Sequence, residues 1–204
     1  MRSREHPAGR VASAIARMCM PEIDRARIES RARDAYPREA CGLLLGENLG
    51  ESVRVVAVLP ARNLCASEDG FELDPAGHLA AEREAERLGA TIVGIWHSHP
   101  DRPATLSVRD LARAWCAWVY VVASVDARGR TELRAWRVRD GRAIEVWLDD
   151  SASSADRSTL LASRPRSGVG ADPDRAHCRQ IRNCTASVRP VVEADSGSRY
   201  QNWQ

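Results

Sequence analysis

Lysine is absent from this sequence: all 30 basic residues among its 204 residues are arginine. The absence indicates a GC-rich coding bias, and it leaves the chain without a lysine at which another protein could be joined through an isopeptide bond. Long apolar runs are absent too. Because no stretch of about 18 apolar residues occurs, the sequence predicts no transmembrane helix. Residues 1–10 carry charges with no strongly apolar stretch after them, so we expect no signal peptide and a cytoplasmic protein.

The charge balance and the cysteines exclude further classes of protein. The formal net charge is only +2, so bulk charge predicts neither nucleic-acid nor membrane binding. The 6 cysteines lack the spacing of a disulfide framework, and we expect reduced thiols. His177, Cys178 and Cys184 lie close together in the sequence, but their spacing matches no zinc-binding pattern.

The sequence divides into three parts. Residues 1–20 are polar and rich in alanine and arginine, which predicts a flexible N-terminal segment. Residues 21–148 carry nearly all of the regular hydrophobic patterning, and a hydrophobic content of 44% is enough to build the core of one domain. Residues 149–204 are rich in serine, arginine, aspartate and glycine, which predicts a disordered tail.

Helical and extended patterns alternate within the predicted domain. A first helix begins at Pro21 and ends before Pro37, a second runs from Asp74-Pro75 to Leu88 with Gly89 as its stop, and a third covers 107–115. Strands are predicted at 40–45, 52–59, 91–99, 118–125, 131–138 and 143–147. The nearly continuous apolar character of 91–99 indicates a central, buried strand. The sequence therefore predicts a mixed α/β domain with one curved β-sheet packed by helices.

Two histidines at the end of the predicted central strand form the strongest chemical signal. Side chains alternate along an extended chain, so His97 and His99 share one face and their imidazoles can bind one ion. Asp110 follows eleven residues after His99 and can fold back to supply an oxygen. Two nitrogens and one carboxylate leave one tetrahedral position open for water, which is typical of a catalytic zinc site. By the same alternation Ser98 faces away from the metal and has a packing role.

Other polar residues near this set have competing interpretations. Glu39 directly precedes the apolar strand 40–45, where it can face a cleft as a general base, although alone it would be interpreted as an ordinary solvated glutamate. Ser107 and Asp110 also form a helix capping box, which is compatible with a role in a site. Cys41 is interpreted as a buried small residue, with nucleophilic catalysis as the alternative. Trp96, Trp115 and Trp118 are interpreted as core residues, with one of them lining a substrate groove as the alternative.

Together these residues resemble the motif of the JAMM (MPN-plus) metalloproteases. That motif is an upstream Glu, then His-x-His, seven residues, Ser, two residues and Asp. Here it is matched by Glu39-Ala-Cys-Gly-Leu-Leu-Leu-Gly46, His97-Ser-His-Pro100, Ser107 and Asp110 with no departure. The resemblance spans roughly residues 22–148, and Asn63 with Phe71–Pro75 is similar to the small prokaryotic members. Five residues in fixed order, four of them at fixed spacing, make this composite motif highly specific.

The resemblance implies a role for each motif residue. His97, His99 and Asp110 would bind one Zn²⁺ per chain. Glu39 would hydrogen-bond the zinc-bound water and act first as general base and then as general acid. Ser107 would donate a hydrogen bond to the oxyanion of the tetrahedral intermediate.

The resemblance also implies a substrate and leaves two alternatives open. Small prokaryotic members hydrolyse the amide after the C-terminal Gly-Gly of a ubiquitin-like sulfur-carrier protein, releasing an amino acid such as cysteine or a C-terminal extension. We expect this function first, and it would place the protein in sulfur or cysteine metabolism. The alternatives are a ubiquitin-like isopeptidase of a bacterial conjugation system and a non-catalytic MPN scaffold. Zinc deaminases are excluded, because their Pro-Cys-x-x-Cys element is missing. No sequence signal defines the oligomeric state.

Overall fold

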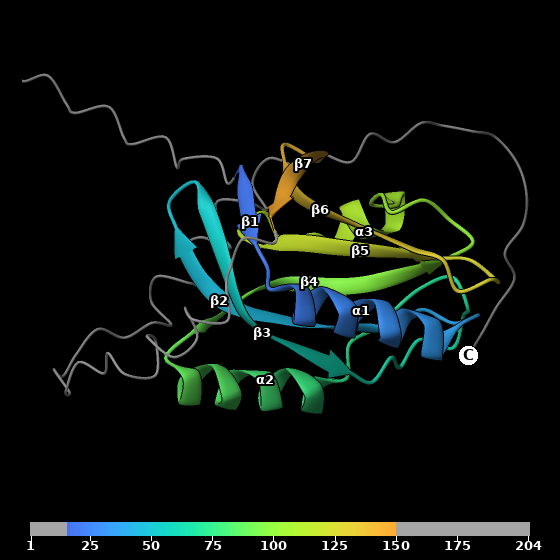
Figure 1. Ribbon diagram of the computed structural model, residues 1–204, viewed down its shortest axis with the longest axis horizontal. Helices are drawn as coiled ribbons and strands as arrows, with labels where there is room; N and C mark the ends of the chain where they lie inside the picture. Colours follow the sequence, from blue (N-terminus) through green and yellow to red (C-terminus); the bar gives the residue numbers. More distant parts are fainter. Residues whose placement is uncertain (1–15, 150–204) are drawn as a thin grey trace, which may run out of the picture. The chain divides into compact units, whose positions relative to one another are not determined.

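The computed structural model describes residues 16–149. It contains strands β1 (Arg17–Cys19), β2 (Cys41–Leu49), β3 (Ser52–Ala61), β4 (Thr91–Pro100), β5 (Val119–Val125), β6 (Thr131–Arg139) and β7 (Arg142–Asp149). It also contains helices α1 (Glu22–Ala35), α2 (Pro75–Leu88) and α3 (Val108–Arg113) (Figure 1). Every helix and strand predicted between residues 21 and 148 is present, so the predicted mixed α/β fold is confirmed.

The described strands form one mixed sheet in the order β1-β3-β2-β4-β5-β6-β7. The sheet closes into a barrel because β1 pairs in parallel with both β3 and β7. Strand β4 lies between β2, which is antiparallel to it, and β5, which is parallel. The prediction of a central strand at 91–99 is therefore confirmed, and both backbone edges of β4 are held by neighbouring strands.

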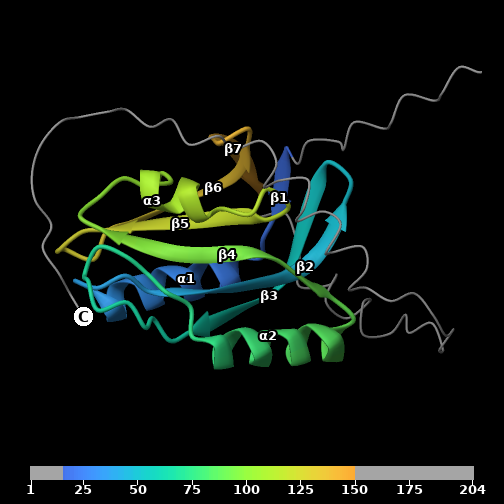
Figure 2. The same cartoon turned by 180° about the vertical axis from the view of Figure 1, so that it is seen from behind.

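Helices α1 and α2 pack against different sets of core residues. Ile28 and Ala32 of α1 are fully buried in a cluster that includes Leu44 of β2. Ala81 and Ala85 of α2 belong to a second cluster, which includes the neighbouring Leu43 and Leu45. Because adjacent residues of β2 point to opposite faces, the two helices cover opposite faces of the sheet, as Figure 2 also shows.

Local signals explain the limits of α2. The side chain of Asp74 accepts a hydrogen bond from the backbone N–H of Ala76, and Pro75 begins the helix, where its missing N–H costs nothing. Gly89 ends the helix with φ of 66°, in the left-handed region that glycine adopts without strain. The chain then turns directly into β4, so this helix fixes where the strand with the two histidines begins.

The structure corrects several expectations. Residues 17–19 form β1, and Met18 and Met20 are fully buried, so the predicted flexible segment 1–20 is wrong for these residues. Strand β2 does not end at Gly46 but continues to Leu49 past a register irregularity. The predicted helix 107–115 ends at Arg113.

The cysteine and tryptophan expectations are met in part. Cys19, Cys41 and Cys65 are free thiols as expected, whereas Cys116 is disulfide-bonded. Trp96 and Trp118 are buried, but Trp115 is half exposed and does not belong to the core.

The remaining sequence predictions concern membrane spans and the C-terminal part. No described helix combines the length and apolarity needed to cross a membrane. The predicted tail 149–204, with His177, Cys178 and Cys184, lies outside the described residues apart from Asp149.

Candidate metal centre

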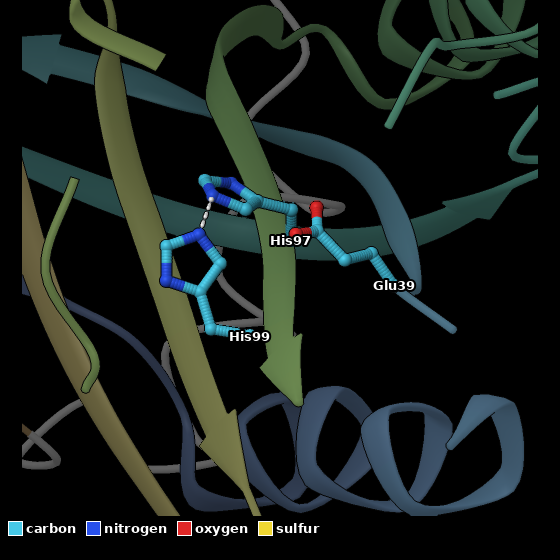
Figure 3. Close-up of side chains that lie close together, drawn as sticks. All are labelled: Glu39, His97 and His99. Carbon is cyan, nitrogen blue, oxygen red and sulfur yellow. Dashed lines mark hydrogen bonds between the residues drawn. The ribbon is translucent and has the colours of Figure 1, made fainter. Parts of the chain in front are cut away.

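His97 and His99 project from β4 on the same side of the sheet, as their spacing predicted (Figure 3). His97 is fully buried and His99 is 3% exposed. The intervening Ser98 is also buried, and its Oγ accepts a hydrogen bond from the backbone N–H of Ala40 at 2.8 Å. Ser98 thus joins the segment before β2 to the histidine strand, which agrees with its predicted packing role.

Three donor atoms converge beside these histidines. The Nε2 atoms of His97 and His99 are 3.1 Å apart, and Oδ2 of Asp110 lies 3.5 Å from the first and 3.4 Å from the second. Ligand bonds of about 2.0–2.1 Å at a tetrahedral ion place neighbouring ligand atoms about 3.3 Å apart. The separations fit one ion between these three side chains.

Contacts outside the donor triangle orient both imidazoles. Nδ1 of His99 donates to the carbonyl oxygen of Pro103 at 3.1 Å, which leaves the Nε2 lone pair directed at the other donors. The ring of His97 stacks on Phe71 with centroids 4.5 Å apart. Its Nδ1 has no hydrogen-bond partner among residues 16–149. Burial lowers the pKa of His97, so the ring is held as the neutral imidazole that metals bind.

Asp110 is positioned by the first turn of α3. Ser107 caps this helix: its Oγ accepts from the backbone N–H of Asp110 at 3.1 Å, and its backbone N–H donates to Oδ2 of Asp110 at 2.7 Å. The Ser107 hydroxyl also donates to this Oδ2 at 2.6 Å. Burial opposes ionisation, but the nearby imidazoles of His97 and His99 and the hydrogen bond from Ser107 hold the pKa of Asp110 well below its usual range. The capping box therefore places the carboxylate, and the two interpretations of Ser107 and Asp110 are compatible.

Glu39 lies two residues before the start of β2, and its carboxylate is almost completely buried. Its Oε1 accepts a hydrogen bond from the guanidinium of Arg102, which forms an ion pair with it. Burial raises the pKa of Glu39, while the charges of His99 and Arg102 act in the opposite direction. A raised pKa is suited to a group that must accept and then return a proton.

Two sets of three residues are therefore candidate metal ligands. Donor atoms of Glu39, His97 and His99 lie within 4.8 Å of one another, which makes them a potential set. Asp110 is the better third ligand on geometry, because one oxygen lies within 3.5 Å of both imidazole nitrogens. Arg102 already donates to Oε1 of Glu39, which makes Glu39 the poorer candidate for the third ligand.

A cavity of about 210 Å³ opens beside the donor atoms. It is lined by the segment Asp69–Leu73, which is its first wall, by Arg109 and Arg113 of α3, and by Glu39, His97, Ser107 and Asp110. Asn63 fixes the first wall with four hydrogen bonds, donating to the carbonyls of Glu39 and Gly70 and accepting from the N–H groups of Cys65 and Glu72. The wall and Glu39 are thus tied to one side chain.

The structure brings all five predicted site residues together and adds others that sequence reasoning missed. Arg102 had no signal, because an arginine among thirty basic residues is not distinctive. The resemblance to the family includes Asn63 and Phe71 but implies no role for either residue. Cys41 is buried, and burial raises the pKa of its thiol to about 12, so it is the inert residue that was expected.

Known proteins are similar to this chain in sequence and in fold. A desampylase of Haloferax volcanii is 31% identical over 139 residues, which cover 65% of this chain and 97% of that protein. A CysO-cysteine peptidase of Mycobacterium tuberculosis is 33% identical over 117 residues, or 57% of this chain and 79% of that one. The solution structure of a protein from Desulfitobacterium hafniense has a TM-score of 0.59 at 28% identity, covering 64% of this chain and 90% of that one. The family model for prokaryotic homologs of the JAB domain matches residues 21–139. Because that match covers more than half of the chain, the protein belongs to the prokaryotic homologs of the JAB domain, as the JAMM resemblance predicted.

Proposed function

We propose that this protein is a zinc-dependent hydrolase that cleaves the amide bond after the C-terminal Gly-Gly of a small ubiquitin-like sulfur-carrier protein, releasing an amino acid such as cysteine or a short extension. Residues 21–148 form the catalytic domain in this proposal. The observation that carries it is the convergence of His97, His99 and Asp110 at ligand spacing, with the buried Glu39 beside them. A scaffold has no need of this arrangement, so the non-catalytic alternative is disfavoured.

In the proposed reaction the ligands are the two imidazoles and the carboxylate of Asp110. A bound zinc ion supplies Lewis acidity, which activates water and polarises the scissile carbonyl. Glu39 takes a proton from the attacking water and passes it to the leaving nitrogen. The Ser107 hydroxyl, which donates to Asp110 in this structure, would turn to donate to the developing oxyanion instead.

The substrate class is supported by the cavity and by a relative. A cavity of about 210 Å³ accommodates a narrow extended segment, and a tail without side chains suits such a passage. The similar M. tuberculosis protein carries the name CysO-cysteine peptidase. The segment Asp69–Leu73 lines this cavity, and we expect the tail to lie beside it.

Intact mass spectrometry tests the proposal. The zinc-loaded protein is incubated with a carrier that ends in Gly-Gly-Cys, and with the same carrier joined through Gly-Gly to a lysine side chain. We expect loss of one cysteine residue with the native protein and none with Glu39→Ala. Faster cleavage of the lysine adduct would favour the isopeptidase alternative. If one zinc is bound and neither adduct is cleaved, the proposed function is wrong.

A further inference from the structure

We infer that Arg102 is a specificity residue: its guanidinium binds the α-carboxylate of the amino acid that leaves after the Gly-Gly tail. This inference rests on the proposed function and deepens it, because it assigns the substrate class on the leaving side of the scissile bond. The favoured substrate is an amino acid joined through its α-nitrogen and bearing a free carboxylate. A lysine joined through its side chain is disfavoured.

Arg102 connects two cavities. Glu39 lines the cavity beside the donor atoms, and Arg102 forms an ion pair with Glu39 while lining a second cavity of about 420 Å³. The second cavity is bordered by Asp101, Pro103 and the adjoining ends of β5 and β6. If the tail occupies the first cavity, the group beyond the scissile bond meets the Glu39–Arg102 pair.

The chemistry of the leaving group fits this position. Glu39 must come within about 3 Å of the leaving nitrogen to protonate it. In an α-amino acid the carboxylate carbon is only about 2.5 Å from that nitrogen. A guanidinium that already touches Glu39 therefore reaches this carboxylate. The guanidinium carries five N–H donors. Among the described residues, Arg102 makes one hydrogen bond, which goes to Glu39.

Three of the four other charged groups of the second cavity, Asp101, Asp126 and Arg130, are already engaged, and Glu132 is the fourth. The hydroxyl of Tyr36 donates to Asp101 at 2.8 Å, and Arg130 donates to Asp126 through Nε at 2.7 Å. Arg130 is thus the rival cation of this cavity, and its own partner holds it. The side chain of Arg102 is 37% exposed, so an incoming carboxylate can approach it.

Substrate pairs that differ only in the carboxylate test the inference. One carrier ends in Gly-Gly-Cys with a free carboxylate and the other ends in the corresponding carboxamide. We expect the native protein to favour the acid about 10- to 100-fold in kcat/KM, which is the range for a charge-assisted hydrogen bond. In Arg102→Gln the ratio should fall to about one, whereas Arg130→Gln, the matched variant of the rival arginine, should keep it.

The ratio of kcat/KM for the acid to that for the carboxamide separates two roles of Arg102. If Arg102 only held Glu39 in place, its loss would slow both substrates equally and leave the ratio unchanged. A ratio near one in the native protein, an unchanged ratio in Arg102→Gln, or a ratio lost in Arg130→Gln would overturn the inference. Circular dichroism establishes that the variants fold. If Arg102→Gln does not fold, Arg102→Lys decides, since lysine lacks the fork that bridges two carboxylates and should reduce the preference at least about threefold.

Binding to the metal-free protein separates this inference from the proposed function. Without metal the carriers are not turned over, and calorimetry compares the affinity of the acid and the carboxamide directly. A preference for the acid that Arg102→Gln abolishes supports the inference even if the zinc-loaded protein cleaves neither carrier. Cleavage without any preference in rate or affinity would leave the proposed function standing and contradict the inference.

Discussion

Replacing Asn63 should loosen the cavity wall and Glu39 together. Asn63→Ala removes four hydrogen bonds, to the backbone of Glu39, Cys65, Gly70 and Glu72. A typical bond contributes about 0.5–1.5 kcal/mol net, so the four sum to about 2–6 kcal/mol. Water can replace part of this at a half-buried residue, so we expect the free energy of unfolding to fall by about 2–3 kcal/mol. Urea unfolding followed by tryptophan fluorescence measures the loss.

Two further variants make the test of Asn63 specific. Asn63→Asp keeps the oxygen that accepts from Cys65 and Glu72 but places a carboxylate against the carbonyls of Glu39 and Gly70. It should therefore lower kcat/KM for the Gly-Gly-Cys carrier about tenfold or more. Asn48→Ala, at an exposed position of β2, is the matched control and should change stability by less than about 0.5 kcal/mol. The reasoning is refuted if Asn63→Ala is as stable as Asn48→Ala and equally active.

Three other results are expected. Burial raises the pKa of the Cys41 thiol to about 12, so iodoacetamide at pH 8 should label Cys19 long before Cys41. Labelling of Cys41 at the rate of an exposed thiol would contradict its buried position. Burial also raises the pKa of Glu39. As the pH is lowered, kcat/KM of the zinc-saturated protein should therefore begin to fall above the ordinary glutamate pKa of about 4.3. A fall that occurs only at or below about pH 4.3 would contradict the assignment of Glu39 as the base. Zinc at about 100 times its dissociation constant should stabilise the fold by about 2.7 kcal/mol, which a chelator reverses in a thermal melt; no shift would argue against a metal bound to the folded state.

Local signals in the sequence were sufficient for most of the fold. The helix limits at Asp74 and Gly89 are set by capping and by a left-handed φ, which depend only on nearby residues. The alternation of His97, Ser98 and His99 fixed which side chains share a face. Ser107 and Asp110 could be placed because a capping box positions a carboxylate in the first helical turn.

Features that depend on distant contacts could not be predicted in this way. Strand β1 has only three residues and is ordered by pairing with β3 and β7, which lie far from it in sequence. The ion pair between Arg102 and Glu39 spans 63 positions and has no local pattern. The hydrogen bonds of Asn63 have no local pattern either. Its side chain reaches the backbone of both Glu39 and Glu72 only after the sheet has formed.

Zinc content of two matched variants tests the central claim most directly. Glu39→Gln and Asp110→Asn each replace a buried or half-buried carboxylate with its amide. If Asp110 is the third ligand and Glu39 the base, Glu39→Gln should bind one zinc per chain and fail to cleave the carrier, whereas Asp110→Asn should lose the zinc. Full zinc content in Asp110→Asn, with loss of zinc in Glu39→Gln, would contradict the account and make Glu39, His97 and His99 the ligand set.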